Sequence, residues 1–417
     1  MKKLHNLRNG KITKCQVCGN QKLKKIINLG KQPPCDSLVD LKDIKKKERK
    51  YPLKFLFCNH CLLGQIDYVV PKGELFFSEY PYRSGITKTL VEKLYCTSDS
   101  TISRLKNIKK KFCVDIGSND GTLLKGFKRY GYEVQGVEAT NIAKIANSNG
   151  IDTIQGFFDE NLAKQIVKQK GCASVVTATN VFAHVPNMYS IMKGIDELLD
   201  ENGIFVSESH YLFDLIESLQ YDAIYHEHLK YYSLKSLIEF FKFYNFEVFD
   251  IEFIKNYGGS IRVFTCRKGR YKITNKVEKC LESELSKTKN YGDMFESFYK
   301  KVKKNKKKIS DLVNDYHDKG KKVIGIGCPG RCSTMINYCS ISKKKMHYIA
   351  EQSTSLKINK FLPGAKIPII DEKEMFKTPP DLAILLSWHY SDEIIKILRG
   401  KGFKSKILVP LPELKII

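Results

Sequence analysis

The chain has 417 residues, of which 42% are hydrophobic and 28% are charged, a composition typical of a soluble protein of roughly two or three domains. No apolar run reaches about 18 residues and no apolar segment lies near the N-terminus, so we expect no membrane helix, no secretory signal and a cytoplasmic location. The formal net charge of +26 suits nucleic-acid, anionic-lipid or phosphorylated ligands alike, and therefore selects no partner.

Four cysteines form two pairs near the N-terminus, Cys15 with Cys18 and Cys58 with Cys61. Each CxxC pair can occupy a tight turn, and two such turns supply the four thiolates that Zn²⁺ prefers in a tetrahedral structural site. A redox pair is the alternative. The gap between the pairs requires a small domain to fold between them, so we predict a zinc-binding domain over residues 1–85. The remaining cysteines are expected to be buried as small apolar residues.

Apolar strands alternate with helical patterns from about residue 112 onward. Alternation of this kind predicts a parallel sheet covered by helices, in an α/β domain over residues 86–272. The predicted strands are 111–117, 132–138, 173–182 and 203–209.

The first of these strands leads into a glycine-containing loop, VDIGSNDGTLL. Gly117 and Gly121 let a ligand approach the backbone closely, and their G-x-x-x-G spacing differs from the G-x-G-x-x-G of dinucleotide-binding folds. Glu138 ends the next strand, where its carboxylate can accept hydrogen bonds from two ribose hydroxyls. This succession is the signature of S-adenosylmethionine binding in Rossmann-like methyltransferases. An ordinary βαβ unit with a glycine turn is the alternative.

The segment after the third predicted strand, TATNVFAHVPN (177–187), bears on the methyl acceptor. Methyltransferases that act on exocyclic base nitrogens often carry an Asn/Asp-Pro-Pro-aromatic tetrapeptide in this region, and this chain has none there. His184 stands in its place. It is either a buried, hydrogen-bonded core residue or a member of the site.

Residues 225–228, YHEH, crowd several proton-exchanging side chains into one short segment. His226 and His228 are i, i+2, on opposite sides of a helix, whereas a helical zinc motif needs i, i+4. The many aromatic residues nearby argue against a surface helix. An acid/base site fits better, because carbon methylation beside a ketone needs a base to remove the α proton, and histidine titrates near neutral pH. Glu227 would then orient the imidazole, and a tyrosine hydroxyl would bind the developing oxyanion.

The last third of the chain contains a helical stretch and a second alternating region. Residues 273–316 favour helix and include the run KKVKKNKKK, which we expect to form the solvated face of a connector. Residues 317–417 are predicted to form a smaller, Rossmann-like α/β domain. Its predicted strands are 321–327, 346–352 and 381–388, and helical or turn segments are predicted at 336–341 and 391–402.

The segment YDAIYHEHLKYYSL (221–234) resembles the middle-domain motif of the nucleotide-sugar C-methyltransferases that make branched deoxysugars. The resemblance extends over nearly the whole chain and includes the two CxxC pairs. Its other motifs are YPYRSG (80–85), VDIGSNDGTLL (114–124), GVEAT (136–140), NYGGSIRVF (256–264), FLPGAKIPI (361–369) and LLSWHYSDEI (385–394).

The resemblance implies a substrate, a cofactor and a set of site residues. In that family the substrate is typically a dTDP-linked 4-keto-6-deoxysugar, methylated on the carbon beside the ketone. The implied catalytic residues are His228 as the base, Tyr225 and Glu227 in its support, and His184 and Tyr82 in the same pocket. The implied S-adenosylmethionine contacts are Asp115, Gly117, Ser118, Asn119, Asp120, Gly121, Glu138, Phe157 and Asn180. The zinc is structural in the family, and the C-terminal domain helps to bind the nucleotide.

Two departures from the family pattern concern the choice of substrate. Residues 330–334 read GRCST where the family usually has a Lys-Gly-Asn-Thr-like run, which puts the nucleotide or sugar specificity in question and makes Arg331 a candidate phosphate ligand. His210 stands where proline is common.

Two other classes of protein stay open. An O- or N-methyltransferase acting on a sugar or another small molecule would use the same cofactor domain without removing an α proton. A zinc-containing nucleic-acid methyltransferase or binder would account for the net charge, although the basic runs are not interleaved with aromatic residues. We therefore expect a monomeric enzyme with a nucleotide-activated sugar as substrate and with no nucleic-acid or membrane partner.

Overall fold

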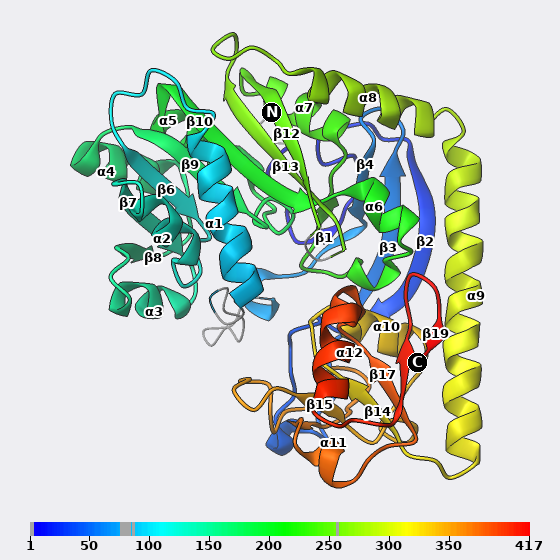
Figure 1. The fold of residues 1–417 in the computed structure, drawn as a ribbon. Coiled ribbons are helices and arrows are strands. Elements are labelled where there is room, and N and C mark those ends of the chain that lie inside the picture. The colour runs from blue at the N-terminus through cyan, green and yellow to red at the C-terminus, as the bar shows by residue number, and fades with distance from the viewer. Residues whose placement is uncertain (1–3, 76–84, 86–87, 256–257) are drawn as a thin grey trace.

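A seven-stranded sheet forms the core of the central domain. The structure, a computed structural model, describes residues 4–75, 85, 88–255 and 258–417 (Figure 1). The strand order is β12-β13-β10-β9-β6-β7-β8, in which β13 is antiparallel to both neighbours and the other adjacent pairs are parallel. The strands are β6 (Phe112–Ile116), β7 (Glu133–Glu138), β8 (Thr153–Gln155), β9 (Ala173–Thr179), β10 (Leu199–His210), β12 (Phe246–Ile254) and β13 (Ser260–Arg267).

Helices link these strands and cover the sheet. Because helices pack against the sheet, its inner strands are continuous apolar runs, and every residue of β6 is buried. The four strands predicted for this region are confirmed, as is the Rossmann-like fold. The helices are α1 (Lys88–Ile102), α2 (Thr122–Lys128), α3 (Ile142–Ser148), α4 (Glu160–Lys170), α5 (Met188–Leu198), α6 (Leu212–Glu217) and α7 (Leu234–Lys242).

The N-terminal domain contributes three strands to a sheet that a distant segment completes. Its order is β11-β4-β3-β2, and β11 comes from the central domain, directly after the YHEH segment. The strands are β2 (Leu23–Gln32), β3 (Tyr51–Cys58), β4 (Leu63–Ile66) and β11 (Lys230–Tyr231), and a separate pair joins β1 (Gly10–Lys11) to β5 (Tyr68–Val69). The YHEH segment is therefore tied to the N-terminal domain by backbone pairing.

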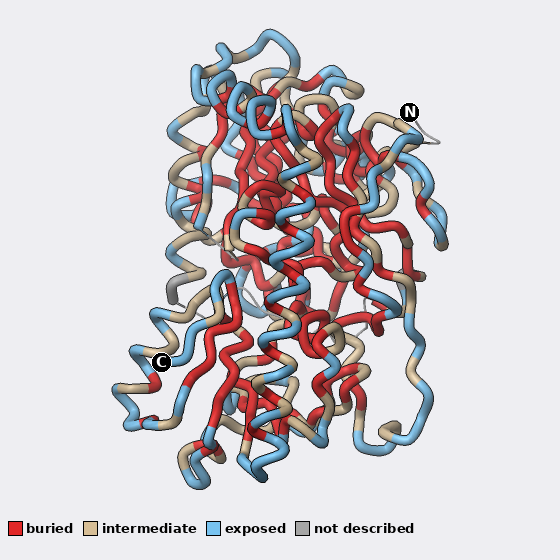
Figure 2. Tube along the Cα trace, turned by 90° about the vertical axis from the view of Figure 1, so that its right-hand side faces the viewer, coloured by how far each residue is buried: buried red, intermediate tan, exposed pale blue. Residues whose placement is uncertain are grey.

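Two helices, α8 (Asn275–Lys287) and α9 (Tyr291–Asp318), lead from the central sheet to the C-terminal sheet. In Figure 1, α9 runs along one edge of the molecule, and it contacts both β2 and the C-terminal sheet. Its buried residues follow helical spacing, and they include Phe298, Val302 and Ile309. Figure 2 looks onto this edge, where exposed and half-buried stretches dominate the surface of α9. The lysine run is thus a solvated face, as predicted.

The C-terminal domain is a second α/β unit with a six-stranded sheet. Its order is β16-β15-β14-β17-β18-β19, with only the last pair antiparallel. The strands are β14 (Val323–Ile326), β15 (Ile349–Glu351), β16 (Ile369–Asp371), β17 (Leu382–Leu385), β18 (Lys406–Val409) and β19 (Lys415–Ile416), and the helices are α10 (Cys332–Tyr338), α11 (Glu374–Lys377) and α12 (Ser391–Gly400).

Two composition-based expectations can be compared with the structure. None of the helices within the described ranges is long and apolar enough to cross a membrane. Most cysteines outside the two CxxC pairs are buried, but Cys96 and Cys172 are exposed, so the expectation of burial is wrong for these two. Cys96 lies on the exposed side of the middle of α1, and Cys172 lies in the short loop between α4 and β9.

Candidate active site

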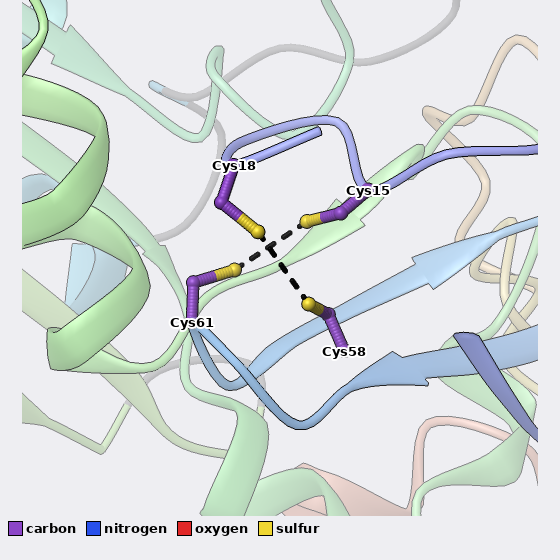
Figure 3. A group of neighbouring side chains, drawn as sticks. All are labelled: Cys15, Cys18, Cys58 and Cys61. Atoms are coloured by element: carbon purple, nitrogen blue, oxygen red, sulfur yellow. Dashed lines mark hydrogen bonds between the residues drawn. The ribbon is translucent and has the colours of Figure 1, made fainter. Parts of the chain in front are cut away.

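The sulfur atoms of the two CxxC pairs converge on one point, as Figure 3 shows. Cys15 Sγ lies 3.4 Å from Cys61 Sγ, and Cys18 Sγ lies 3.6 Å from Cys58 Sγ. These separations are too long for an S–S bond of about 2.0 Å and close to the roughly 3.8 Å between two ligands of a tetrahedral Zn–S site. The donor set fits zinc, and these four residues would hold it.

The glycine loop after β6 leaves no room for side chains at its two glycines. Gly117 and Gly121 have φ of +71° and +77°, in the left-handed region. A Cβ on Gly117 would lie 2.6 Å from Val181, and one on Gly121 would lie 2.8 Å from Ile151. Ser118 in the same loop is buried, and its Oγ has no hydrogen-bond partner among the described residues. A buried polar atom of this kind is expected where a ligand is to bind.

Glu138 ends β7 beside this loop, as predicted, with its carboxylate oriented by the backbone. One oxygen accepts a hydrogen bond from the Asn119 amide at 3.0 Å, and the other accepts from the Thr140 amide at 2.8 Å. Each carboxylate oxygen has a second lone pair, so both can still accept ribose hydroxyls. Phe157 follows β8 with 60% of its surface exposed.

The two aspartates of the loop have partners within the protein. Asp115 is buried in β6, where it accepts a hydrogen bond from Thr177 at 2.6 Å, and burial raises the pKa of its carboxyl to about 7. Asp120 accepts hydrogen bonds from the Gly85 amide and the Thr122 hydroxyl, each at 2.7 Å. Both carboxylates therefore shape the loop from within.

Asn180 lies just after β9, at the same edge of the sheet as Ser118 and Glu138. Its φ is +57°, and its amide donates to the Glu208 carbonyl at 2.8 Å. The carboxyl ends of parallel strands meet at one edge, which is where such folds bind their ligands. The predicted cofactor residues are thus gathered there.

Replacing Glu138 with alanine is expected to weaken S-adenosylmethionine binding about 10- to 100-fold, since hydrogen bonds to a charged group contribute about 1.5–3 kcal/mol. Isothermal titration calorimetry would measure the change. Glu133 begins the same strand with a carboxylate that is 42% exposed, so Glu133→Ala is the matched control and should bind as the wild type does. Wild-type affinity in Glu138→Ala would contradict the assignment.

The side chains of the YHEH segment contact different partners. Tyr225 Oη and His228 Nε2 lie 2.9 Å apart in a hydrogen bond. His226 Nε2 is bound to the Pro52 carbonyl, 3.1 Å away, so its imidazole faces the N-terminal domain. Glu227 accepts a hydrogen bond from the Cys35 thiol at 3.1 Å. The two histidines of the segment therefore do not share a ligand site.

The structure corrects the role predicted for Glu227. Its carboxylate was expected to orient the His228 imidazole, but within the described residues it bonds the thiol of Cys35, and Tyr225 holds the imidazole instead. Burial, followed by the charge of Asp36, raises the pKa of Glu227 to about 8. This carboxyl is therefore mostly protonated at neutral pH. Cys35, which lies far away in the sequence, carries no local signal of this contact.

Three buried histidines, His184, His210 and His228, lie together. The ring centroid of His184 is 4.7 Å from that of His228, and the centroid of His210 is 5.0 Å away. Burial lowers the pKa of His184 to about 4, that of His210 to about 3, and that of His228 to well below its usual value. The His228 imidazole is thus neutral at physiological pH, which is the form that accepts a proton.

One residue of this cluster, His210, was not assigned to the site from the sequence. His210 departs from the family pattern, and that departure is the signal that could have placed it beside His228. Tyr82, expected in the same pocket, lies outside the described residues.

Arg331, a candidate phosphate ligand from its sequence context, has an acidic partner within the protein. It is buried at the start of α10, and its guanidinium forms a two-point ion pair with Asp222. Asp222 belongs to the 3₁₀ turn η4 (Tyr221–Ala223), just before the YHEH segment. Residues 330–334, which depart from the family pattern, thus include a residue that contacts the turn before the YHEH segment.

The strand order with antiparallel β13, the glycine loop after β6 and the acid at the end of β7 define a class I, S-adenosylmethionine-dependent methyltransferase. Three family models match the chain: a C-methyltransferase C-terminal domain over 255–412, a zinc binding domain over 15–76 and a methyltransferase domain over 90–251. With these three matches, the chain is similar over most of its length to C-methyltransferases. It is an enzyme whose cofactors are S-adenosylmethionine and a structural zinc ion.

One relative matches the chain over almost its full length. The chain is 29% identical over 412 residues to the C-methyltransferase NovU of Streptomyces niveus, and the match covers 97% of each protein. Among solved structures, the glycopeptide N-methyltransferase MtfA with S-adenosylmethionine covers 41% of this chain and 93% of its own, with 9% identity and a TM-score of 0.33. Magnesium protoporphyrin IX methyltransferase of Synechocystis PCC 6803 covers 45% and 90%, with 10% identity and a TM-score of 0.34. Neither solved structure bears on the methyl acceptor.

Proposed function

We propose that the protein methylates a nucleotide-linked 4-keto-deoxysugar on the carbon beside the ketone, through an enolate formed by His228. The observation that carries the proposal is the buried, neutral His228 imidazole, held by the Tyr225 hydroxyl at 2.9 Å and flanked by two further histidines. Methyl transfer to oxygen or nitrogen needs no such base at a carbon acid. The likeness to the C-methyltransferase NovU supports transfer to carbon.

The hydrogen bonds of His228 indicate which nitrogen would take the proton. Nε2 is bound to the Tyr225 hydroxyl, whereas Nδ1 is buried with no hydrogen-bond partner among the described residues. If Nε2–H donates to Tyr225, Nδ1 carries the lone pair and accepts the α proton. S-adenosylmethionine supplies the electrophilic methyl group for the resulting enolate carbon.

Glu227 supports the oxyanion side of the reaction in this proposal. Because its carboxyl is buried with a pKa near 8, it can donate a hydrogen bond to the ketone oxygen as negative charge develops there. The Cys35 thiol donates to the other side of the same carboxyl and fixes its position. This arrangement polarises the ketone, which makes the neighbouring C–H more acidic.

The C-terminal domain would bind the nucleotide part of the substrate, and we place the reaction in the cytoplasm. The domain contacts η4, the turn just before the YHEH segment, through α10. None of the thirteen cysteines, all within the described ranges, forms a disulfide, which suits a reducing compartment.

The test is a panel of dTDP-, GDP- and CDP-linked 4-keto-6-deoxysugars incubated with S-adenosylmethionine that carries a trideuterated methyl group. We expect one panel member to gain the labelled methyl on the carbon beside the ketone, as measured by mass spectrometry and NMR. A labelled methyl on oxygen or nitrogen would contradict the proposal.

A further inference from the structure

The C-terminal domain holds the segment that carries the proposed base through one buried ion pair. Arg331 Nε and Nη2 donate to the two carboxylate oxygens of Asp222 at 2.9 and 2.8 Å. The side chains are 7% and 0% exposed. A two-point pair of this kind fixes orientation as well as distance.

Neighbouring side chains complete the same contact. The indole Nε1 of Trp388 donates to Asp222 at 2.8 Å, and its ring lies 5.1 Å from the Arg331 guanidinium. Arg331 also donates to Gln220 Oε1 at 3.0 Å, and the Thr334 hydroxyl donates to the Ile224 carbonyl at 3.2 Å. The start of α10 thus contacts residues 220–224 continuously.

These residues lead directly to the proposed base. The Ala223 carbonyl accepts the Tyr231 hydroxyl at 2.9 Å, and the oxygen of that hydroxyl accepts the Tyr225 amide at 3.3 Å. Tyr225 in turn holds His228. A shift of Asp222 is therefore transmitted to the hydrogen bond between Tyr225 and His228 through adjacent backbone groups.

We infer that Arg331 is a positioning residue, whose ion pair with Asp222 lets the C-terminal domain fix the Tyr225–His228 geometry needed for proton transfer. The inference rests on the proposed role of His228. Without Arg331 the Asp222 carboxylate would be buried and uncompensated, so residues 220–224 would move to hydrate it. Misplacement of a catalytic group by about 1 Å costs about 100-fold in rate.

The test compares Arg331→Gln and Arg331→Lys with a control ion pair elsewhere. Arg104, just after α1, forms a largely buried pair with Asp250 of the edge strand β12 at 2.7 Å, so Arg104→Gln is the matched control. Hydrogen–deuterium exchange, read by mass spectrometry, reports the mobility of residues 221–232 without any substrate. Thermal unfolding, S-adenosylmethionine affinity, kcat and KM complete the comparison.

In Arg331→Gln we expect faster exchange in residues 221–232 and a kcat lowered about 100-fold, with unchanged S-adenosylmethionine affinity. Arg331→Lys should recover part of kcat, because an ammonium restores the charge but not the two-point geometry. Arg104→Gln should keep both the wild-type exchange in this segment and the wild-type kcat. Should Arg331→Gln fail to fold, Trp388→Phe removes a single donor to Asp222 and should shift both readouts in the same direction.

Wild-type exchange and kcat in Arg331→Gln would overturn the inference, as would a change confined to KM, which would make Arg331 a substrate ligand. Hydrogen–deuterium exchange is measured without substrate and therefore does not depend on the proposed reaction. If the wild type methylates no keto sugar, the proposed function fails, while the effect of Arg331 on residues 221–232 is still measured.

Discussion

Replacing His228 with asparagine is expected to lower kcat for C-methylation by about 100- to 10,000-fold, the range over which a positioned general base contributes. Asparagine keeps a polar group of similar size beside Tyr225 but cannot accept the α proton. Steady-state kinetics on the accepted keto sugar would measure the loss. S-adenosylmethionine affinity should stay at the wild-type value, because His228 lies outside the glycine loop and the end of β7.

His226→Asn is the matched control for this substitution. It lies in the same segment, but its imidazole bonds the Pro52 carbonyl and faces the N-terminal domain. The control should therefore keep a kcat close to that of the wild type. Comparable losses in both variants would mean that the segment matters for folding rather than for proton transfer.

Removing the zinc ion is expected to abolish methylation and to unfold the N-terminal domain. A structural zinc contributes about 10 kcal/mol or more, which is comparable to the whole free energy of unfolding of a typical domain. Cys61 lies two residues before β4, and β4 pairs with β11, so loss of the metal also releases the end of the YHEH segment. Gln16, between the first two cysteines, donates to the Leu229 carbonyl at 2.8 Å and adds a second link.

Cys58→Ser would test this expectation, with metal content measured by mass spectrometry and stability by thermal unfolding. The exposed Cys172 offers the control, since Cys172→Ser removes a thiol without touching the cluster. The Cys58 variant should lose zinc, melt at a lower temperature and be inactive, while the control should match the wild type. Full zinc content and stability in Cys58→Ser would contradict the assignment.

Features that depend on residues close together in the sequence were predictable from it. The strands of the central sheet are buried between helices and therefore appear as apolar runs, as FCVDI does in β6. The glycine spacing at Gly117 and Gly121 follows from a loop with no room for a Cβ. The spacing within each CxxC pair likewise reflects a tight turn, so the cysteine cluster could be anticipated.

The contacts between domains could not be predicted, because they leave no pattern in the neighbouring sequence. Strand β11 has only two residues, and it is a strand because β4 offers it a partner. Glu227 contacts Cys35, and Arg331 pairs with Asp222. Both partners are far away in the chain, so no spacing pattern in the sequence could predict either contact. The sequence therefore placed Tyr225 and His184 beside His228 but misassigned the partner of Glu227.

Enolate formation by His228 is tested most directly by hydrogen exchange at carbon. The accepted keto sugar is incubated in D₂O with enzyme but without S-adenosylmethionine, and deuterium at the carbon beside the ketone is followed by NMR. The wild type should exchange this hydrogen, and His228→Asn should leave it at the uncatalysed rate. Equal exchange in the two proteins would contradict the assignment of His228 as the base.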